Sequence, residues 1–316
     1  MGINLISTNP SDIKIDLTNY YKSLEKWSDY NFDDDANSIS LFIDMLSSIS
    51  YKINVYANAS LNESFLSTAK TRDGVVRRAK ELNYTPKSAN CAVANLRLTF
   101  NPDTFPAQII IPKYTKFSAE YDGTTYNFIT LQTYYALYEN NYIVDIEVYQ
   151  GILFNYTFYV TGGQKRFEIP NSNVDTGKLN VKVKATESDI NWATYVLSNN
   201  VIDSATNTNV YYLQENVGEK FEIYFGDGVA GNAISDGNVI SVDYIVTDGY
   251  IANGISSFTL SDTLDYTPTL TTLIPSENGS DIETKDSIKF YAPKFNQTQN
   301  RAVNADDFEA IINSNI

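Results

Sequence analysis

The sequence predicts an α+β fold: an N-terminal helical segment, then a mainly antiparallel β domain, then the start of a further C-terminal helical part. Apolar residues between 38 and 58 recur at steps of three and four, which is the period of one helix face. From residue 92 the period changes to two, as expected of strands with one buried face. Residues 301–316 return to a helical pattern, so the chain is expected to end in a helix.

The first 34 residues carry little pattern, and we expect an arm with a short helix around residues 17–27. A long amphipathic helix is predicted from residue 38 to about 58. The run Asp33-Asp34-Asp35 precedes it, and acidic residues before a helix favour its positive end. A metal site is the alternative interpretation of this run. Two shorter helices are predicted at 62–69 and 72–82, and Pro86 marks the stop.

A series of strands is predicted after the helices, because apolar and polar residues alternate between Pro, Gly and Asn/Asp turn signals. They are expected at 92–100, 107–111, 114–119, 124–130, 131–138, 142–149, 152–160, 179–185, 210–214, 220–225 and 238–247. The polar segment 248–280 is expected to include a long loop. The predicted division is therefore an arm at 1–34, a helical segment at 35–88, a β-rich domain at 89–285 and a further part beginning at 286–316.

The last predicted helix has an N-terminal cap in Asn304, with Asp307 three residues later, close to a capping box. The chain stops before this helix could bury an apolar face. We therefore expect the 286–316 part to be incomplete in a chain that is shorter than its folding unit.

Composition excludes several classes of function. The formal net charge of −15 in 316 residues argues against non-specific nucleic-acid binding and against an anionic membrane surface. The chain has no histidine, which removes Ser-His-Asp, Cys-His and His-zinc chemistry. The single cysteine, Cys91, fits assembly in a reducing cytoplasm. No apolar run approaches the roughly 20 residues that span a bilayer, and no signal peptide is recognised.

The stretch FGDGVAGNAISDGN, residues 225–238, has three possible interpretations. It lacks the Lys of a P-loop, and a strand rather than a helix follows its G-x-G-x-x-G spacing, which disfavours nucleotide binding. A calcium loop using Asp227 and Asp236 stays open, although the EF-hand pattern is absent. The favoured interpretation is two turns between strands. The residues expected to form them are Gly226, Asp227, Gly228, Gly231 and Gly237.

Three stretches taken together resemble the baseplate J-like family of baseplate wedge proteins from contractile-tailed phages. The first is the helical head with NESFLSTA at 62–69 and NYTPKS at 83–88. The second is FGDG at 225–228 with the glycines and ANG that follow, and the third is AP at 292–293 followed by QNRAVN at 299–304. The sequence departs from the family pattern at Asn83, Asn304 and Phe308, where Gly, Thr and Tyr are usual.

The resemblance implies a structural protein of the virion tail baseplate, assembled in the host cytoplasm, with no catalytic residues, metal or cofactor. In wedge proteins of the T-even type, N-terminal helices of two copies pack with helices of a neighbouring wedge protein in a core bundle, and a C-terminal part joins wedges into a ring. Segment 35–88 would be the bundle part and 286–316 the start of the ring part. Sheath-initiator and hub-proximal baseplate proteins are further implied partners, with no nucleic acid or membrane.

The apolar helix faces are the expected partner-helix interface, because few helical residues follow the long helix and could cover it. The residues expected there are Ile39, Phe42, Ile43, Leu46, Ile53, Val75, Val76 and Leu82. The alternative function is a β-rich glycan-binding or receptor-binding tail protein, which the 24 tyrosines would suit. A polysaccharide hydrolase is the third hypothesis, but no local pattern singles out a carboxylate pair.

Overall fold

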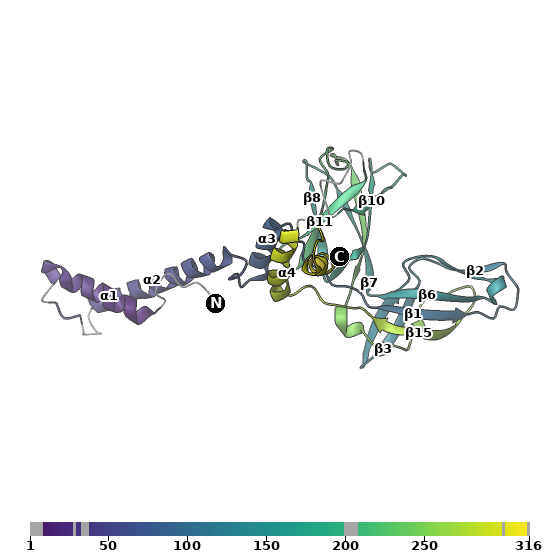
Figure 1. Cartoon of the computed structure of the whole chain (residues 1–316), viewed down its shortest axis with the longest axis horizontal. Coiled ribbons are helices and arrows are strands. Elements are labelled where there is room, and N and C mark those ends of the chain that lie inside the picture. The colour runs from purple at the N-terminus through teal and green to yellow at the C-terminus, as the bar shows by residue number, and fades with distance from the viewer. Residues whose placement is uncertain (1–8, 28–29, 33–37, 199–207, 299–300, 315–316) are drawn as a thin grey trace. The chain divides into compact units, whose positions relative to one another are not determined.

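The computed structural model describes residues 9–27, 30–32, 38–198, 208–298 and 301–314 of the chain (Figure 1). It divides into two compact units, Met1–Glu81 and Leu82–Ile316. Helices come first, mainly antiparallel sheets follow and helices end the chain, so the predicted fold class is confirmed. The finer division into four parts stays a prediction, and the run at 33–35 lies outside the described residues.

The described residues of the first unit form the α-helices α1 (Pro10–Ser23), α2 (Ser38–Glu63) and α3 (Arg72–Glu81). The expected N-terminal helix is present, but it begins earlier than predicted. Asn9 caps it, since its side chain accepts a hydrogen bond from the Ser11 N–H, and Pro10 occupies the first turn, where its missing N–H costs nothing.

The predicted separate helix at 62–69 is wrong. α2 continues to Glu63, and the chain then turns before α3 begins at Arg72. The polar residues Asn62, Ser64 and Thr68 form this turn by hydrogen bonding to nearby backbone carbonyls. Such side chains compete with regular backbone hydrogen bonds, which explains why a helix-like spacing here does not give a helix.

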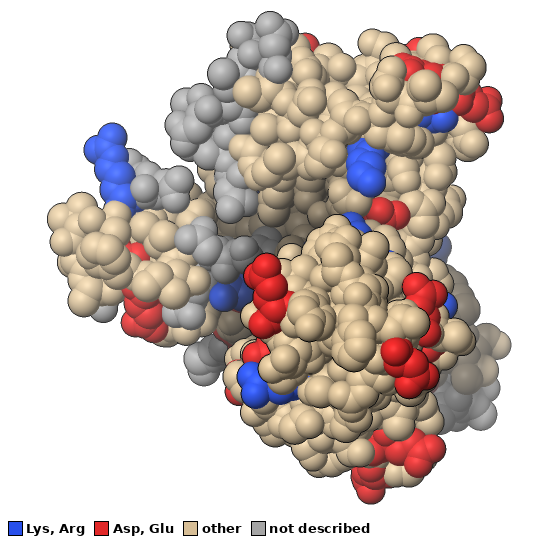
Figure 2. Space-filling view, turned by 90° about the vertical axis from the view of Figure 1, so that its right-hand side faces the viewer, with Lys and Arg blue, Asp and Glu red and all other residues tan. Residues whose placement is uncertain are grey.

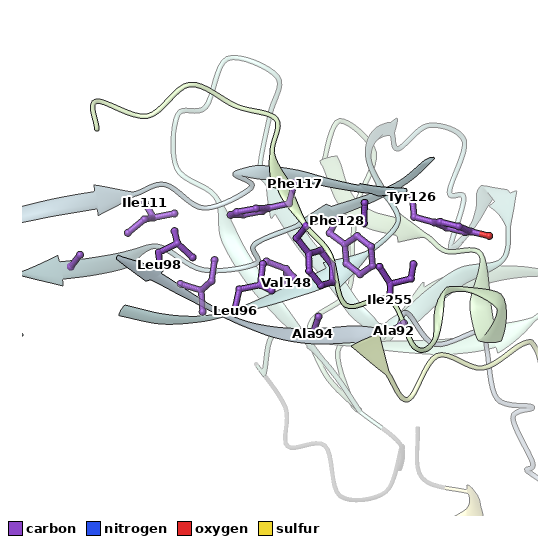
Figure 3. Packing of buried hydrophobic residues seen from close by; sticks show 14 of the residues in the cluster. Ala92, Ala94, Leu96, Leu98, Ile111, Phe117, Tyr126, Phe128, Val148 and Ile255 are labelled. Carbon is purple, nitrogen blue, oxygen red and sulfur yellow. The ribbon is translucent and has the colours of Figure 1, made fainter. Parts of the chain in front are cut away.

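The second unit contains two large sheets. The six-stranded sheet has the order β14-β3-β4-β6-β1-β15 and is entirely antiparallel. Its strands are β1 (Val93–Thr99), β3 (Lys116–Tyr121), β4 (Thr124–Ile129), β6 (Ile143–Gln150), β14 (Thr259–Leu260) and β15 (Thr269–Glu277). A short ribbon of β2 (Gln108–Ile111) and β5 (Tyr134–Leu137) packs on the same core. Figure 3 shows this core, with Leu96, Phe117 and Phe128 pointing toward one another.

The seven-stranded sheet has the order β7-β13-β9-β10-β11-β12-β8 and contains one parallel pair, β10 with β11. Its strands are β7 (Ile152–Tyr159), β8 (Arg166–Ser172), β9 (Val174–Lys184), β10 (Ala193–Leu197), β11 (Val210–Glu215), β12 (Lys220–Phe225) and β13 (Val239–Val246). Its own core is built around Phe167, Ile223 and Val242. The predicted β-rich segment 89–285 thus holds two separate hydrophobic cores.

Every predicted strand overlaps an observed one, but β8, β10, β14 and β15 were missed. The segment 248–280, which was expected to include a long loop, also contains β14 and β15, and β15 pairs with β1. β15 is an edge strand whose side chains are mostly exposed, so its sequence lacks the apolar alternation that marks the other strands. β8 contains Pro170, a residue that is unfavourable inside a sheet but fits the edge position of this strand.

Two helices end the described chain, α4 (Lys285–Thr298) and α5 (Ala305–Ser314). The predicted capping box at the start of α5 is confirmed. The Asp307 N–H donates to the Asn304 side chain at 2.9 Å, and the Asn304 N–H donates to the Asp307 carboxylate at 3.1 Å. Two N–H groups that would otherwise lack partners at the helix start are thereby satisfied.

Candidate interaction surface

One face of α2 is covered within the chain by α1. The Ser47 hydroxyl donates to the Pro10 carbonyl at 2.7 Å, and Lys14 forms an ion pair with Asp44 at 2.7 Å. Ile43 is buried between these contacts. α1 therefore covers the first half of α2 from one side and leaves the opposite side open.

The open side carries a row of large apolar side chains. Their exposed fractions range from 46% to 73%, and they recur at steps of three and four along 42–56. We define the α2 stripe as Phe42, Met45, Ile49, Ile53 and Tyr56. Positions 42, 49 and 56 lie seven residues apart, which is the repeat by which one helix packs along another. A row of this kind on a soluble protein marks an interaction surface more often than chance exposure does.

The predicted interface residues fall into three groups. Phe42 and Ile53 are exposed on the α2 stripe, and Ile39, Leu46 and Leu82 are half-buried. Ile43, Val75 and Val76 are buried in this chain, so a partner could not touch them without rearrangement. The partner-helix interface itself stays a prediction. Met45, Ile49 and Tyr56 were absent from the predicted set, although a step of three from Phe42 reaches Met45 and steps of seven reach Ile49 and Tyr56.

A carboxylate fixes the turn between α2 and α3. Glu63 accepts hydrogen bonds from the Lys70 N–H at 2.8 Å, from the Thr71 N–H at 3.1 Å and from the Thr71 hydroxyl at 2.8 Å. Thr71 in turn caps α3, since its hydroxyl accepts from the Gly74 N–H. A Cβ on Gly74 would collide with the Glu63 carboxylate, which explains a glycine in this first turn.

The segment 83–91 leads from the helices into β1, and we call it the joint segment. It begins at Asn83, whose φ of +57° lies in the left-handed region that Asn tolerates and Gly prefers. The Tyr84 hydroxyl and the Lys87 N–H both donate to the Glu283 carboxylate, at 2.9 and 3.0 Å. Burial, and then the neighbouring Glu283 charge, raise the pKa of the Tyr84 hydroxyl well above its ordinary value.

The other end of the joint segment is held by a buried carboxylate from the seven-stranded sheet. Asp175 Oδ2 accepts from the Cys91 N–H at 3.0 Å and from the Cys91 thiol at 2.8 Å, while its Oδ1 accepts from the Gly177 N–H at 3.0 Å. Burial, and then the Asp175 charge, raise the pKa of the Cys91 thiol. The joint segment is therefore tied to residues that lie 84 and almost 200 positions away. Sequence reasoning missed both Asp175 and Glu283, because neither belongs to a local pattern.

The glycine stretch lies between β12 and β13, where the five residues predicted to form turns are all found outside the strands. The Asp227 carboxylate accepts from the Val229 and Ala230 N–H groups at 3.0 and 3.2 Å, which closes an Asx turn. Asp236 accepts from the Gly163 N–H at 2.9 Å and so ties a different loop. Within the described ranges, no three His, Cys, Asp or Glu residues are grouped so as to hold a metal ion.

The Asp227 turn gives a pH-dependent prediction. Hydrogen bonds from Val229 and then from Ala230 lower the pKa of the Asp227 carboxyl. The ionised carboxylate accepts these bonds and so stabilises the folded state. This stabilisation is complete above the ordinary Asp pKa of about 3.9, and it is lost as the pH falls through the lowered pKa of Asp227 in the folded protein. We expect the amide proton shifts of Val229 and Ala230, followed by NMR, to titrate with a midpoint below the ordinary value. A midpoint at or above it would contradict the turn.

Charge on the surface is mainly acidic. Figure 2 shows Asp and Glu side chains in several separate groups on the face in view, with Lys and Arg scattered among them. None of the described helices is both long enough and apolar enough to cross a bilayer.

Comparison with known proteins finds family matches to two parts of the chain. Residues 10–84, which contain α1 to α3, match the helical domain of baseplate wedge protein gp6-like proteins. Residues 152–249, which contain β7 to β13, match the third domain of bacteriophage baseplate wedge protein gp6. Two parts of the chain thus match gp6-like baseplate wedge domains. The name baseplate J-like, used for the resemblance above, stays a prediction.

The full chain is also similar to one curated relative, the baseplate wedge protein gp6 of Enterobacteria phage T4. The two are 25% identical over 331 aligned residues, which cover 96% of this chain and 49% of the relative. The chain therefore spans about half the length of the gp6 protein that it matches. Together with the two gp6-like domain matches, this similarity supports a baseplate wedge protein.

Two solved structures show looser likeness. One is the anti-feeding prophage baseplate, with 12% identity, a TM-score of 0.34, and coverage of 94% of this chain and 53% of that one. The other is the TssK-TssF-TssG baseplate subcomplex of a type VI secretion system, with 7% identity, a TM-score of 0.39, and coverage of 88% and 82%. Both superpositions are too loose to carry a functional argument.

Proposed function

We propose that this chain is a structural, non-enzymatic component of a contractile tail baseplate wedge in the virion. It links wedge subunits and relays baseplate rearrangement to the sheath. The observation that carries the proposal is the α2 stripe, because it lies within the segment that matches the gp6-like helical domain. A helix whose apolar face is left open in one chain requires a partner to bury it.

The proposed occupants of the stripe are the α2 helix of a second copy and a helix of a neighbouring wedge protein, packed as a bundle. The seven-residue step of Phe42, Ile49 and Tyr56 suits this packing, because it keeps one seam facing a partner helix. Sheath-initiator and hub-proximal baseplate proteins are proposed as further neighbours of the assembled wedge. A part that follows residue 286 would join adjacent wedges into a ring.

The proposed relay is mechanical. The joint segment is tied by buried hydrogen bonds to Asp175 on one side and by partly buried ones to Glu283 on the other. A buried polar network that is fully satisfied resists deformation, because opening any bond leaves an unpaired group. A displacement of the second unit, Leu82–Ile316, which we call the β unit, would therefore be passed along the joint segment instead of being absorbed by it.

The test replaces two stripe residues with aspartate, Phe42→Asp together with Ile49→Asp. Burying a carboxylate against apolar partners costs several kcal/mol, so assembly of wedges into baseplates is expected to fail. Both positions are exposed in the free chain, so its unfolding free energy should change by only about 0.5 kcal/mol. Assembly is measured by sedimentation of tail particles, and folding by circular dichroism.

The matched control is Ser48→Asp together with Ala59→Asp, which adds the same two negative charges to α2 at exposed positions outside the stripe. It is expected to assemble like the unmodified protein. Normal assembly of the Phe42/Ile49 variant would remove the bundle from the proposal. The glycan-binding alternative would then be the next hypothesis to examine.

A further inference from the structure

β7 is an edge strand without a single charged residue. Its sequence is ILFNYTFY, and it pairs with β13 over all eight residues without a shift in register. It ends the order of the seven-stranded sheet, so none of the strands that the structure describes pairs with its other side. A long, regular and uncharged edge is a template for pairing with another strand.

The other sheet edges among the described strands are protected. β8, at the opposite end of the same sheet, carries Arg166, Glu168 and Pro170. β15 contains Pro275 and two register shifts, β14 has two residues, and β2 and β5 have four each. Charges, proline, irregular register and shortness are the usual means by which proteins prevent edge pairing. β7 uses none of them, which sets it apart from the rest of the described sheets.

The side chains of β7 extend the core face of the sheet to this edge. Ile152, Phe154 and Tyr156 lie opposite inward-facing residues of β13, yet they remain 51%, 38% and 44% exposed. Phe154 stacks on the buried Tyr244, with ring centroids 5.9 Å apart. An added strand would cover this row and complete the apolar face.

The hydrogen-bond pattern fixes which residues of β7 point outward. The Val160 N–H donates to the Asn238 carbonyl at 3.0 Å, so the even-numbered residues of β7 form the bonded pairs with β13. The odd-numbered residues then direct their N–H and C=O groups to the open edge. Gly151 follows the same rule, because its N–H points away from β13 and donates to the Asn127 carbonyl of β4 at 2.8 Å.

We propose that the β7 edge pairs antiparallel with β7 of a second copy of this chain about a twofold axis. Two copies of a chain with net charge −15 repel each other, and a strand without charge is where they can approach. In an antiparallel pair of identical strands about a twofold axis, both chains contribute the same residues. The apolar row of β7 therefore forms both sides of the contact. This surface is independent of α2 and of the proposed function.

The same observations select a register. Outward-pointing odd residues must pair with odd residues, so the twofold axis passes through a single residue near the middle of the strand. An axis through Asn155 would require the Gly151 N–H opposite Tyr159, but that N–H is already bonded to Asn127. An axis through Tyr156 avoids this conflict. It sets Tyr156 opposite its own copy and Phe154 opposite Phe158.

Disulfide cross-linking tests this arrangement. In Tyr156→Cys the two thiols face each other in a non-hydrogen-bonded pair with Cα atoms about 4.5 Å apart, within disulfide reach. In the matched control Phe154→Cys, which removes an aromatic residue from the same row, the two cysteines lie about four residues, roughly 14 Å, out of register. After mild oxidation we expect about tenfold more covalent dimer from Tyr156→Cys. The native cysteine, Cys91, is buried and contributes little background.

A second measurement does not alter the apolar row. Mixing Asn155→Cys with Thr157→Cys should give a mixed disulfide, because these positions are opposite each other in the proposed pair. Thermal unfolding checks that all variants are folded. Equal cross-linking of Tyr156→Cys and Phe154→Cys, or no mixed disulfide between folded proteins, would overturn the proposal and favour a strand from a different protein. Stripe variants of α2 should leave the cross-link unchanged.

Discussion

Replacing Asp175 with alanine is expected to lower the unfolding free energy of the β unit by about 2–4 kcal/mol. The Asp175 side chain is 2% exposed and accepts three hydrogen bonds, two of them from the backbone N–H groups of Cys91 and Gly177. Alanine leaves both N–H groups without this acceptor in a place where water does not replace it. The loss is measured by urea unfolding followed by near-ultraviolet circular dichroism.

Cys91 provides a second readout at the same site. Burial raises the pKa of its thiol, so the native protein should react slowly with a thiol reagent at neutral pH. Asp175→Ala removes the neighbouring charge and loosens the joint segment, and both changes should speed the reaction. Cys91→Ala is the control for stability, because it removes only the thiol bond and keeps the Cys91 backbone, with an expected cost of about 1 kcal/mol. Equal stability of the two variants would show that Asp175 does not hold the joint segment.

Most of the helices and strands could be predicted from the spacing at which apolar residues recur in the sequence. α2 was recognisable because its apolar residues follow the helical period, and β1 because Ala92, Ala94, Leu96 and Leu98 alternate with less buried residues. The capping box at Asn304 and Asp307 is likewise local, since its partners are three residues apart. Features that depend on neighbours in sequence could be derived without a structure.

The contacts of the joint segment and the pairing of the edge strands could not be predicted from local sequence patterns. Asp175 and Glu283 reach the joint segment from distant parts of the chain, and no local pattern distinguishes them from other acidic residues. β15 is a strand because β1 lies beside it, whereas its own threonines and exposed side chains resemble a loop. The openness of β7 is also a property of the strand order, which periodicity does not reveal.

The same distinction applies to the glycine stretch. Gly228, Gly231 and Gly237 have φ values between +82° and +93°, which is the left-handed region where a turn pattern favours glycine. Gly226 differs, because its φ lies outside the left-handed region. Its backbone conformation is therefore one that a residue with a side chain can also adopt. Its requirement for glycine comes from the packing of a neighbouring loop segment against its Cα.

Gly226→Ala is therefore expected to lower the unfolding free energy by about 3 kcal/mol or more. An added Cβ would collide with the Ala230 carbonyl and approach the Gly231 carbonyl oxygen to 2.6 Å. Both obstacles are backbone atoms, which cannot rotate away as a flexible side chain could. The Ala230 carbonyl also accepts a hydrogen bond from the Tyr212 hydroxyl at 3.3 Å, so displacing it disturbs β11 as well.

Gly237→Ala is the matched control, because it separates backbone conformation from close packing. Gly237 has a φ of +91°, but a Cβ there would meet no atom within 4 Å. Alanine should cost only the conformational penalty of about 1–2 kcal/mol. Urea unfolding of both variants, followed by tyrosine fluorescence, should rank Gly226→Ala as the more damaging. The reverse order would mean that φ, rather than the approach of the Ala230 and Gly231 carbonyls, fixes glycine in this stretch.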